Sequence, residues 1–384
     1  MLKKLSISNF KNIDEEQFDL SNLTIFTGLN SSGKTSVLQS LLLLSKKYSL
    51  QPSADLNHYI SFFSKFSEVR NKYLKENNIT TIVATSGKGE KYTYTLNEQG
   101  IEEVDYSILK RLAPAIKKSI TSEENKKNKS KDDFLEYIEK IANMTSNLFS
   151  YEDSLYYLSA NRIGPEDISQ INHEKKVGIN GEYLIGYLAQ NKFKNVDSAI
   201  QKFKDNATLA YQVDKWLKDI LGIDISTNLD IVDDMHAKLS FDIEGVTKLS
   251  PLNVGSGNSY LLKLLILCLS CVKGDIVIIE NPEIHLHPKA QAKLGEFFSF
   301  LAENGIQIIL ETHSEHLINK VRYQVKKNEI SNKKVHIYYK ASIRDNFTAI
   351  DIDNTGHFVD KGNQRVPFPT GFFDTSLENL MEIG

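Results

Sequence analysis

The stretch GLNSSGKTS, residues 28–36, decides the fold of this chain. It fits the pattern G-x-x-x-x-G-K-[ST]. An apolar, strand-like run, LTIFTG at 23–28, comes before it, and a leucine-rich run typical of a helix, TSVLQSLLLLSKKY at 35–48, comes after it. Small residues let backbone N–H groups curl around phosphates, and the helix N-terminus adds the positive end of its dipole. The stretch therefore predicts a phosphate-binding loop between a strand and a helix.

The residues of this loop take different parts in binding a nucleotide. Lys34 reaches the β- and γ-phosphates, and the hydroxyl of Thr35 is a ligand for Mg²⁺. The other expected contacts to the nucleotide are Asn30, Ser31, Ser32, Gly33 and Ser36.

A second motif, IVIIENPEIHLHP at 276–288, has the form of a magnesium-binding strand. Four apolar residues run into Glu280, and a carboxylate at the end of a buried parallel strand is costly unless it holds a metal or a water network. We therefore expect Glu280 to share the metal with Thr35. The next position, where such strands usually carry an acid for the attacking water, holds Asn281. An amide can orient water but cannot accept its proton at neutral pH, so we expect slow hydrolysis.

Two residues could supply the chemistry that Asn281 lacks. Glu283 lies just beyond Pro282, on a turn that could swing its carboxylate toward the γ-phosphate. The run ILETHSEH at 309–316 delivers His313 to the same edge of the sheet, where its ring can bond a γ-phosphate or the attacking water. We favour His313 as the residue that positions water and Glu283 as a structural acid of the turn. The alternative is that Glu283 is the base.

A third motif, LNVGSGNSYLLKLL at 252–265, places glycines and a serine directly before a helix. This forms another anion site, without a lysine, whose expected contacts are Ser256 and Gly257. A second phosphate-binding helix end so far along the chain is explained if it closes over nucleotide bound to a partner subunit. The motif therefore predicts a homodimer or a higher oligomer.

Strands and helices alternate at both ends of the chain and enclose a more helical middle, which indicates an α/β domain with a large insertion. We expect strands at 2–10, 23–28, 275–280, 306–312 and 334–339, a strand that ends in a loop at 154–165, several strands within 223–244, and a hairpin at 80–96. We expect helices at 35–48, from about 101 to 148, over most of 182–221, and at 258–273, 289–303 and 314–327. The predicted parts are an N-terminal ATPase portion at 1–98, a mainly helical lobe at 99–273, a C-terminal ATPase portion at 274–340, and a short element at 341–384.

The composition limits the class of protein. A hydrophobic share of 41% and a charged share of 25% are typical of a soluble globular protein, and the net charge of −3 gives no general attraction to nucleic acid or membrane. Any DNA contact is therefore expected to be local and independent of base sequence. Two cysteines suit a reducing cytoplasm. The start, MLKKLSISNF, lacks the apolar run of a signal peptide, and the apolar run at 261–272 is too short for a membrane span.

The order of these motifs resembles the ABC-type heads of the SMC, RecF and OLD ATPases. The closing PFPTGFFD, at 367–374, narrows the resemblance to standalone bacterial AAA-family ATPases with a short C-terminal domain. These ATPases are often encoded beside nucleases in defence islands and are similar to the PtuA ATPase of Septu systems. The resemblance implies a mixed sheet with flanking helices, a mainly helical inserted lobe and a short C-terminal β element.

The resemblance also implies roles for particular residues. Ser256 with its glycines would act as the signature in trans, residues 286–288 would form the D-loop, and His313 would be the switch histidine. Lys11, in SNFKN, stands where such heads often place a basic residue near the nucleotide, and Arg162 is a counterpart of the Q-loop.

The implied function is a slow, ATP- and Mg²⁺-dependent ATPase that dimerises around nucleotide and controls an associated effector, such as a nuclease, in anti-phage defence. The alternative is a nucleotide-gated DNA clamp or sensor with little turnover, or an ATPase of the DNA-repair type. We expect no intrinsic nuclease.

Three further patterns suggest other chemistry. CLSC at 268–271 and HLH at 285–287 have zinc-like spacing, but the cysteines lie in a leucine-rich helix. IDIDNTG, at 350–356, offers an acidic pair like that of a nuclease, although an edge strand before a turn explains it better. The aromatic FPTGFF is either a plug that binds a partner or a tail packed on the core.

Overall fold

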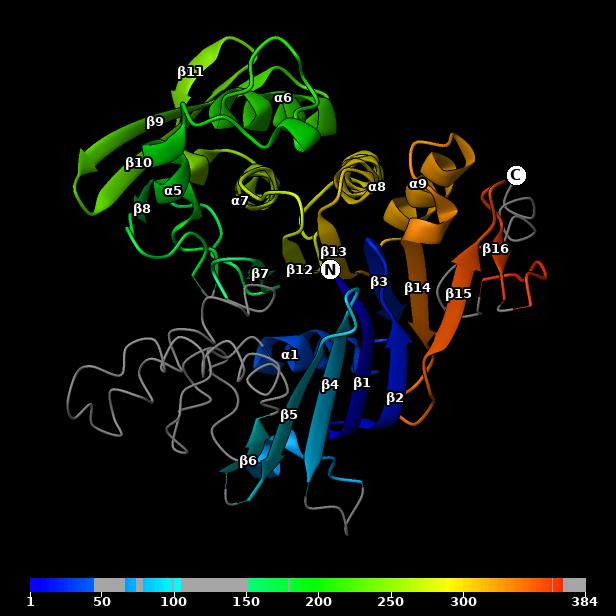
Figure 1. Ribbon diagram of the computed structural model, residues 1–384. Helices are drawn as coiled ribbons and strands as arrows, with labels where there is room; N and C mark the ends of the chain where they lie inside the picture. Colours follow the sequence, from blue (N-terminus) through cyan, green and yellow to red (C-terminus); the bar gives the residue numbers. More distant parts are fainter. Residues whose placement is uncertain are drawn as a thin grey trace, which may run out of the picture. The chain divides into compact units, whose positions relative to one another are not determined.

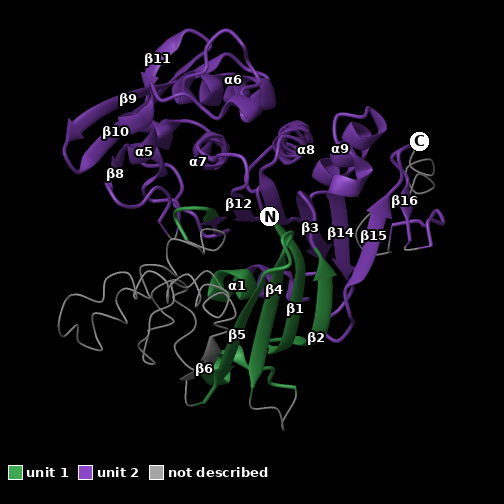
Figure 2. Ribbon diagram, viewed as in Figure 1, with its two compact units in different colours: residues 1–19, 39–155 green, residues 20–38, 156–384 purple. Residues whose placement is uncertain are grey.

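The computed structural model describes residues 1–44, 66–73, 79–98, 100–104, 151–178, 180–360 and 362–368. Contacts divide the chain into two compact units (Figure 2), with Met1–Asp19 and Gln39–Leu155 in unit 1, and Leu20–Leu38 and Tyr156–Gly384 in unit 2. The division falls inside α1 (Lys34–Leu44). The four-part division expected from the sequence stays a prediction.

Unit 1 is built on a five-stranded antiparallel sheet. Along β4, buried residues alternate with partly exposed ones, the period of a sheet with one covered face. In sheet order the strands are β2 (Ile13–Asp19), β1 (Leu2–Phe10), β4 (Thr80–Ser86), β5 (Lys91–Asn97) and β6 (Gly100–Val104). The short helix α2 (Phe66–Val69) belongs to the same unit.

Unit 2 contains a seven-stranded mixed sheet (Figure 1). Its central strands β14, β3, β13 and β12 are parallel neighbours, and β15 and β16 extend it in antiparallel fashion. Every residue of β3, β12 and β13 is buried, as expected for parallel strands covered on both faces. In sheet order the strands are β16 (Phe358–Val359), β15 (Thr348–Ile352), β14 (Val335–Lys340), β3 (Leu23–Gly28), β13 (Gln307–Glu311), β12 (Ile276–Glu280) and β7 (Leu155–Leu158).

Helices cover one face of this sheet (Figure 1). Helix α8 packs on β3 and β13 and contacts both α6 and α9. Trp216 of α6 is buried with its ring edge-on to Phe297 of α8, at 4.8 Å between centroids, so the helices share one aromatic core. The helices are α5 (Leu184–Asn191), α6 (Leu209–Leu221), α7 (Ser256–Leu269), α8 (Pro288–Glu303) and α9 (Glu315–Lys326), with 3₁₀ turns at Ser198–Ile200, Pro251–Asn253 and Asn332–Lys334.

A second sheet in unit 2 lies near α5 and α6 in the sequence and in space. Strand β10 pairs with β8, β9 and β11, all antiparallel. The strands are β8 (Ile168–Gln170), β9 (Ile225–Asp233), β10 (His236–Ile243) and β11 (Val246–Leu249). Within the described residues, no helix has both the length and the apolar character needed to cross a membrane.

The expected mixed α/β architecture with flanking helices is confirmed, as are the hairpin at 80–96 and the strands and helices from 258 onward. The helical pattern expected from 101 is wrong for residues 101–104, which form the end of β6 against β5. The rest of that pattern, at 105–148, and most of the closing aromatic motif lie outside the described residues. The strands β2, β8, β11 and β16 escaped the sequence analysis because each is short, polar or both.

Candidate nucleotide site

The glycine-serine loop joins the end of β3 to the start of α1. Gly28 has a φ of 134°, and a Cβ there would lie 2.1 Å from the backbone oxygen of Lys340 on β14. Glycine is therefore required twice at this position, by its backbone angle and by the neighbouring strand. Ser31 and Gly33 also have positive φ angles, of 61° and 111°, which curl the loop.

The side chain of Lys34 lies inside this loop and is only 2% exposed. Its Nζ donates to the backbone oxygens of Gly28, at 3.2 Å, and Leu29, at 2.8 Å. Burial lowers the pKa of Lys34, and Glu311, whose Oε1 lies 3.8 Å from Nζ, opposes this. Of the other expected phosphate contacts, Ser32 and Ser36 are buried, while Asn30 and Ser31 are exposed at the mouth of the loop.

Glu280 ends β12, as the sequence predicts, and is 6% exposed. Both of its carboxylate oxygens accept hydrogen bonds from residues in or just after β7: Oε1 from the Tyr157 hydroxyl at 2.7 Å, and Oε2 from the Ala160 N–H at 3.1 Å. The expected role of Glu280 as a metal ligand stays a prediction.

Arg162 lies in the loop after β7, two residues beyond Ala160, and forms hydrogen bonds with the end of β12. Its guanidinium donates to the backbone oxygens of Glu280, at 3.0 Å, and Asn281, at 3.1 Å. Burial lowers the pKa of Arg162 to about 10, so it remains charged at neutral pH. The structure thus brings this expected Q-loop counterpart to the magnesium-type strand.

Asn281 has a positive φ, 42°, and its N–H donates to the backbone oxygen of Glu311 at 2.9 Å. Asparagine tolerates this left-handed backbone better than most residues. Its Oδ1 is buried and has no hydrogen-bond partner in the described part of the chain.

Glu283 and His313 meet at the same end of the sheet. Glu283 Oε1 accepts a hydrogen bond from the backbone N–H of His313 at 2.7 Å, while burial raises the pKa of Glu283. Partial desolvation of the ring, with the Lys34 charge as the smaller cause, lowers the pKa of His313 to about 4. The imidazole is therefore neutral at neutral pH and can both donate and accept one hydrogen bond.

Glu311 was overlooked by the sequence analysis, although it stands two residues before His313 in the same motif. The Thr35 hydroxyl donates to Glu311 Oε2 at 2.7 Å. Glu311 is 5% exposed, and burial raises its pKa. The signal was an acidic residue at the end of an otherwise apolar strand, the same signal that singled out Glu280.

The side chains at this edge fit a nucleotide with a magnesium ion. Buried oxygens of Ser32, Asn281 and Glu283 lack a hydrogen-bond partner within the described residues, whereas buried polar atoms are normally bonded. No group of three His, Cys, Asp or Glu side chains in the described ranges could hold a metal by itself. Magnesium would therefore depend on a hydroxyl, a carboxylate, phosphates and water, the ligands it takes in nucleotide sites.

The signature-like motif forms the start of α7, where Ser256 is the first helical residue and no side chain caps the free N–H groups. A Cβ at Gly257 would lie 2.5 Å from the backbone oxygen of His285, so glycine lets the helix approach the turn after β12. The expected D-loop follows, and His287 caps α8 by accepting from the Lys289 N–H. In the described part of the chain no hydrogen bond joins Ser256 to the phosphate loop.

Lys11 belongs to unit 1. Its Nζ donates to Gln39 of the same unit, and its N–H donates to the backbone oxygen of Val69 at 2.7 Å. The expected position of Lys11 near the nucleotide stays a prediction.

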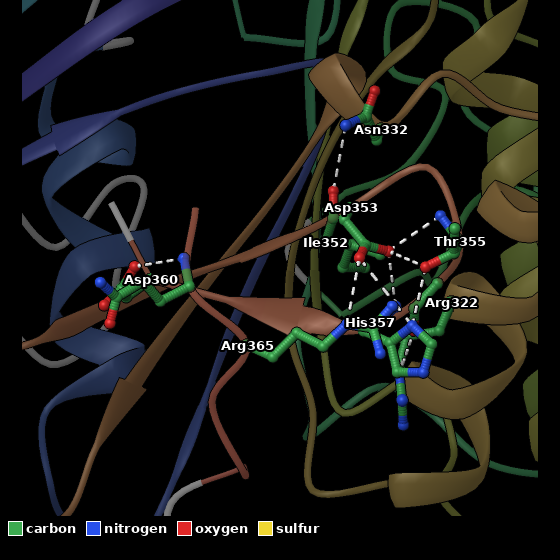
Figure 3. A network of polar contacts seen from close by, with 10 residues as sticks. Arg322, Asn332, Ile352, Asp353, Thr355, His357, Asp360 and Arg365 are labelled. Atoms are coloured by element: carbon green, nitrogen blue, oxygen red, sulfur yellow. Dashed lines mark hydrogen bonds and ion pairs between the residues drawn. The ribbon is translucent and has the colours of Figure 1, made fainter. Parts of the chain in front are cut away.

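The acidic residues at 351 and 353 each have a hydrogen-bond partner within the chain. Asp353 caps its own turn by accepting from the N–H groups of Thr355 and His357 (Figure 3). Asp351 Oδ1 lies 2.9 Å from Nδ1 of His336. The interpretation as a strand before a turn is confirmed, although β15 is covered by β16 and is not itself the edge. The zinc-like cysteines Cys268 and Cys271 are fully buried and unbridged.

A parallel strand, a lysine-bearing glycine loop, a helix and a carboxylate on the next strand define a P-loop ATPase. The chain belongs to the AAA ATPase domain family, whose model matches residues 1–318.

Two curated relatives are the DNA replication and repair proteins RecF of Thermoanaerobacter sp. (strain X514) and Thermoanaerobacter pseudethanolicus. Each is 26% identical over 234 residues, which cover 57% of this chain and 63% of the relative. The match thus spans less than two thirds of these relatives. Among solved structures, the SMC head domain of Thermotoga maritima matches 92% of this chain and 99% of its own, with a TM-score of 0.45 and 10% identity.

Proposed function

We propose that this protein is a cytoplasmic ATPase that binds ATP with Mg²⁺, closes a homodimer or higher oligomer around the nucleotide, and hydrolyses it slowly. The closed state would control an associated effector, such as a nuclease, in bacterial anti-phage defence. The observation that carries the proposal is the phosphate loop itself. Lys34 bonds the carbonyls of that loop, and Thr35 bonds a carboxylate of the neighbouring strand.

In the proposed site, the N–H groups of the loop and the Lys34 ammonium hold the phosphates, and Thr35 with a carboxylate holds the magnesium ion. The ion would neutralise charge on the phosphates. His313, neutral at pH 7, orients the attacking water, and Ser256 of the partner subunit meets the γ-phosphate.

Slow turnover follows from Asn281, which cannot accept a proton. A positioned base typically contributes 10²–10⁴-fold, so turnover well below ~1 s⁻¹ is expected. ATP would then persist in the closed dimer, and its release would be the regulated event.

Calorimetry with ATP tests nucleotide binding. Lys34→Ala should bind at least ~100-fold more weakly because it removes the buried charge that faces the phosphates. Lys333→Ala, at an exposed lysine of the same unit, is the control. Equal ATP affinities for Lys34→Ala and the unmodified protein would refute the proposal.

A second candidate function is a DNA clamp, sensor or repair-type ATPase. The similarity to the two RecF proteins, which are DNA replication and repair proteins, favours it. Steady-state ATP turnover with and without DNA separates the two candidates, because a defence ATPase that acts through a protein effector needs no DNA stimulation. Purification from the native operon would show whether a nuclease or a nucleic acid accompanies the protein. DNA binding should be weak, salt-sensitive and indifferent to sequence.

A further inference from the structure

Three glutamates face the end of the sheet beside the phosphate loop, and they have different partners. Glu280 accepts from Tyr157 and Ala160, in or just after β7. Glu283 accepts from the backbone of His313. Glu311 accepts from the hydroxyl of Thr35 and lies 3.8 Å from the ammonium of Lys34.

The order of the strands explains this difference. Glu280 and Glu311 are register partners on the adjacent parallel strands β12 and β13, so both carboxylates leave the sheet at the same level. However, β13 is the strand that lies directly beside β3, which carries the phosphate loop, and β12 is one strand further away. On the far side of β12 lies β7, from which Tyr157 reaches Glu280.

The contact between Thr35 and Glu311 has the form that a magnesium site requires. A threonine hydroxyl that ligates a cation through its oxygen must direct its proton elsewhere, and at 2.7 Å the carboxylate of Glu311 accepts that proton. The Glu311 carboxylate also forms an ion pair with the Lys34 ammonium. When Lys34 turns to phosphates, a buried carboxylate would lose its cation, and burying an unpaired charge is costly. A magnesium ion beside Thr35 would restore the balance.

We propose that Glu311 is the carboxylate that acts with Thr35 on the magnesium ion of the bound nucleotide, while Glu280 secures the end of β12 to the β7 side. This assignment rests on the proposed nucleotide site and replaces the ligand expected from the sequence. Glu311 would also place a negative charge beside Asn281, which occupies the position where related strands usually carry an acid.

Isosteric amides separate this role from a structural one. In Glu311→Gln the amide oxygen still accepts from Thr35. In Glu280→Gln the amide oxygen can still accept from the Ala160 N–H, while the amide NH2 can donate to the Tyr157 hydroxyl oxygen in place of the bond that Glu280 accepted. Each variant therefore keeps its hydrogen-bond partners and loses the negative charge. The measurement is calorimetric affinity for a non-hydrolysable ATP analogue, in EDTA and in Mg²⁺. It is supplemented by Mn²⁺ affinity at saturating analogue, followed by the electron paramagnetic resonance signal of free Mn²⁺.

We expect Glu311→Gln to bind the analogue in EDTA as well as, or better than, the unmodified protein, and to lose at least ~10-fold in Mn²⁺ affinity. Glu280→Gln should retain Mn²⁺ affinity within about threefold, because it would not face the ion. Glu311→Asp keeps the charge on a shorter side chain, so its Mn²⁺ affinity should lie between those of Glu311→Gln and Glu280→Gln. This variant replaces Glu311→Gln in the test if Glu311→Gln does not fold.

Unchanged Mn²⁺ affinity in Glu311→Gln, or a loss in Glu280→Gln of the same size, would overturn the assignment. Neither outcome would contradict the proposed nucleotide site, because binding of the analogue in EDTA tests that site separately. If the unmodified protein binds no analogue under either condition, it is the proposed function that fails.

Discussion

The guanidinium of Arg162 lies 5.4 Å from the ring centre of Tyr260, where the loop after β7 meets helix α7. The Tyr260 ring also contacts the ring of His285, at 4.9 Å between centroids. Since Arg162 also bonds the backbone oxygens of Glu280 and Asn281, one side chain connects the end of the β12 strand to the signature-like helix. A shift of the end of β12 would therefore disturb the contacts of helix α7, and a shift of α7 would disturb those of β12.

Arg162→Lys should destabilise this connection, because a single ammonium cannot replace a planar guanidinium that bonds the carbonyls of Glu280 and Asn281 and lies over the Tyr260 ring. We expect a loss of about 2–3 kcal/mol in the free energy of unfolding, measured by chemical denaturation. Arg365→Lys, at an exposed arginine, is the control. Equal stabilities of the two variants would contradict the connection.

Ser256→Arg should prevent ATP-driven dimerisation, because a long side chain at the first turn of α7 would occupy the space of the partner's γ-phosphate. Light scattering should show the mass rising with ATP in the unmodified protein and in Ser331→Arg, at an exposed serine, but not in Ser256→Arg. A mass that is the same with and without ATP in all three would show that nucleotide does not drive assembly.

Asn281→Glu should raise ATP turnover at least ~10-fold by supplying a proton acceptor. The positive φ of Asn281 makes glutamate unfavourable there, so the variant should also be less stable. Asn328→Glu is the matched control, because this exposed asparagine has a φ of 59° and lies away from the site. Phosphate release at saturating ATP is the measurement. If both variants turn over ATP at the rate of the unmodified protein, the lack of a base at position 281 does not limit the rate of hydrolysis.

Glu283→Gln separates the two roles considered for this residue. The amide keeps an oxygen for the N–H of His313 but cannot act as a base. If Glu283 is structural, turnover should stay within about threefold of the original, and His313→Ala should reduce it by about 10²-fold. A fall of the same size in the ATP turnover of Glu283→Gln would identify Glu283 as the base. It would contradict the proposal that the protein hydrolyses ATP slowly and stays closed around it.

Asp214→Asn should change how stability depends on pH. Burial raises the pKa of Asp214 from 3.8 to about 6, against the hydrogen bonds that it accepts from Thr227. The folded state therefore binds more protons than the unfolded state between these values, and stability falls as pH rises from about 4 to 6. Asparagine keeps an acceptor for Thr227 without this titration.

The melting temperature of Asp214→Asn should therefore gain about 2–3 °C on the unmodified protein between pH 4 and pH 7. The exposed Asp230→Asn provides the baseline. A constant difference across that range would show that Asp214 is not perturbed in the way described.

The parts of the site that follow from local sequence were predictable. The phosphate loop, Glu280, Asn281 and His313 each lie at or just after the end of a strand with an apolar run, and parallel strands bring such ends to one edge. The partners of these residues were not predictable, because register and strand order are tertiary properties. Glu311 bonds Thr35 only because β13 lies between β12 and β3, which no nearby residue reveals.

The same limit applies to the fold. The run IEEV at 101–104 is charged enough to suggest a helix, but β5 offers it an edge to pair with. Likewise, β8 has three residues and exists through its pairing with β10, far along the chain. Long apolar helices such as α7 and α8 carry their own periodic signal. The expected range 289–303 matches α8 to within one residue at each end, whereas the expected range 258–273 begins two residues after the start of α7 and ends four residues beyond it.

The two cysteines have a practical consequence for labelling. Cys268 and Cys271 are the chain's whole complement of thiols, both are fully buried at the end of α7, and burial raises the pKa of Cys271 to about 12. Since the thiolate is the species that reacts with maleimides, the folded protein should be almost inert to them. A single cysteine introduced at an exposed position could then carry a fluorophore without removal of the native thiols. Reaction at the native pair would report the opening of α7 from its own core.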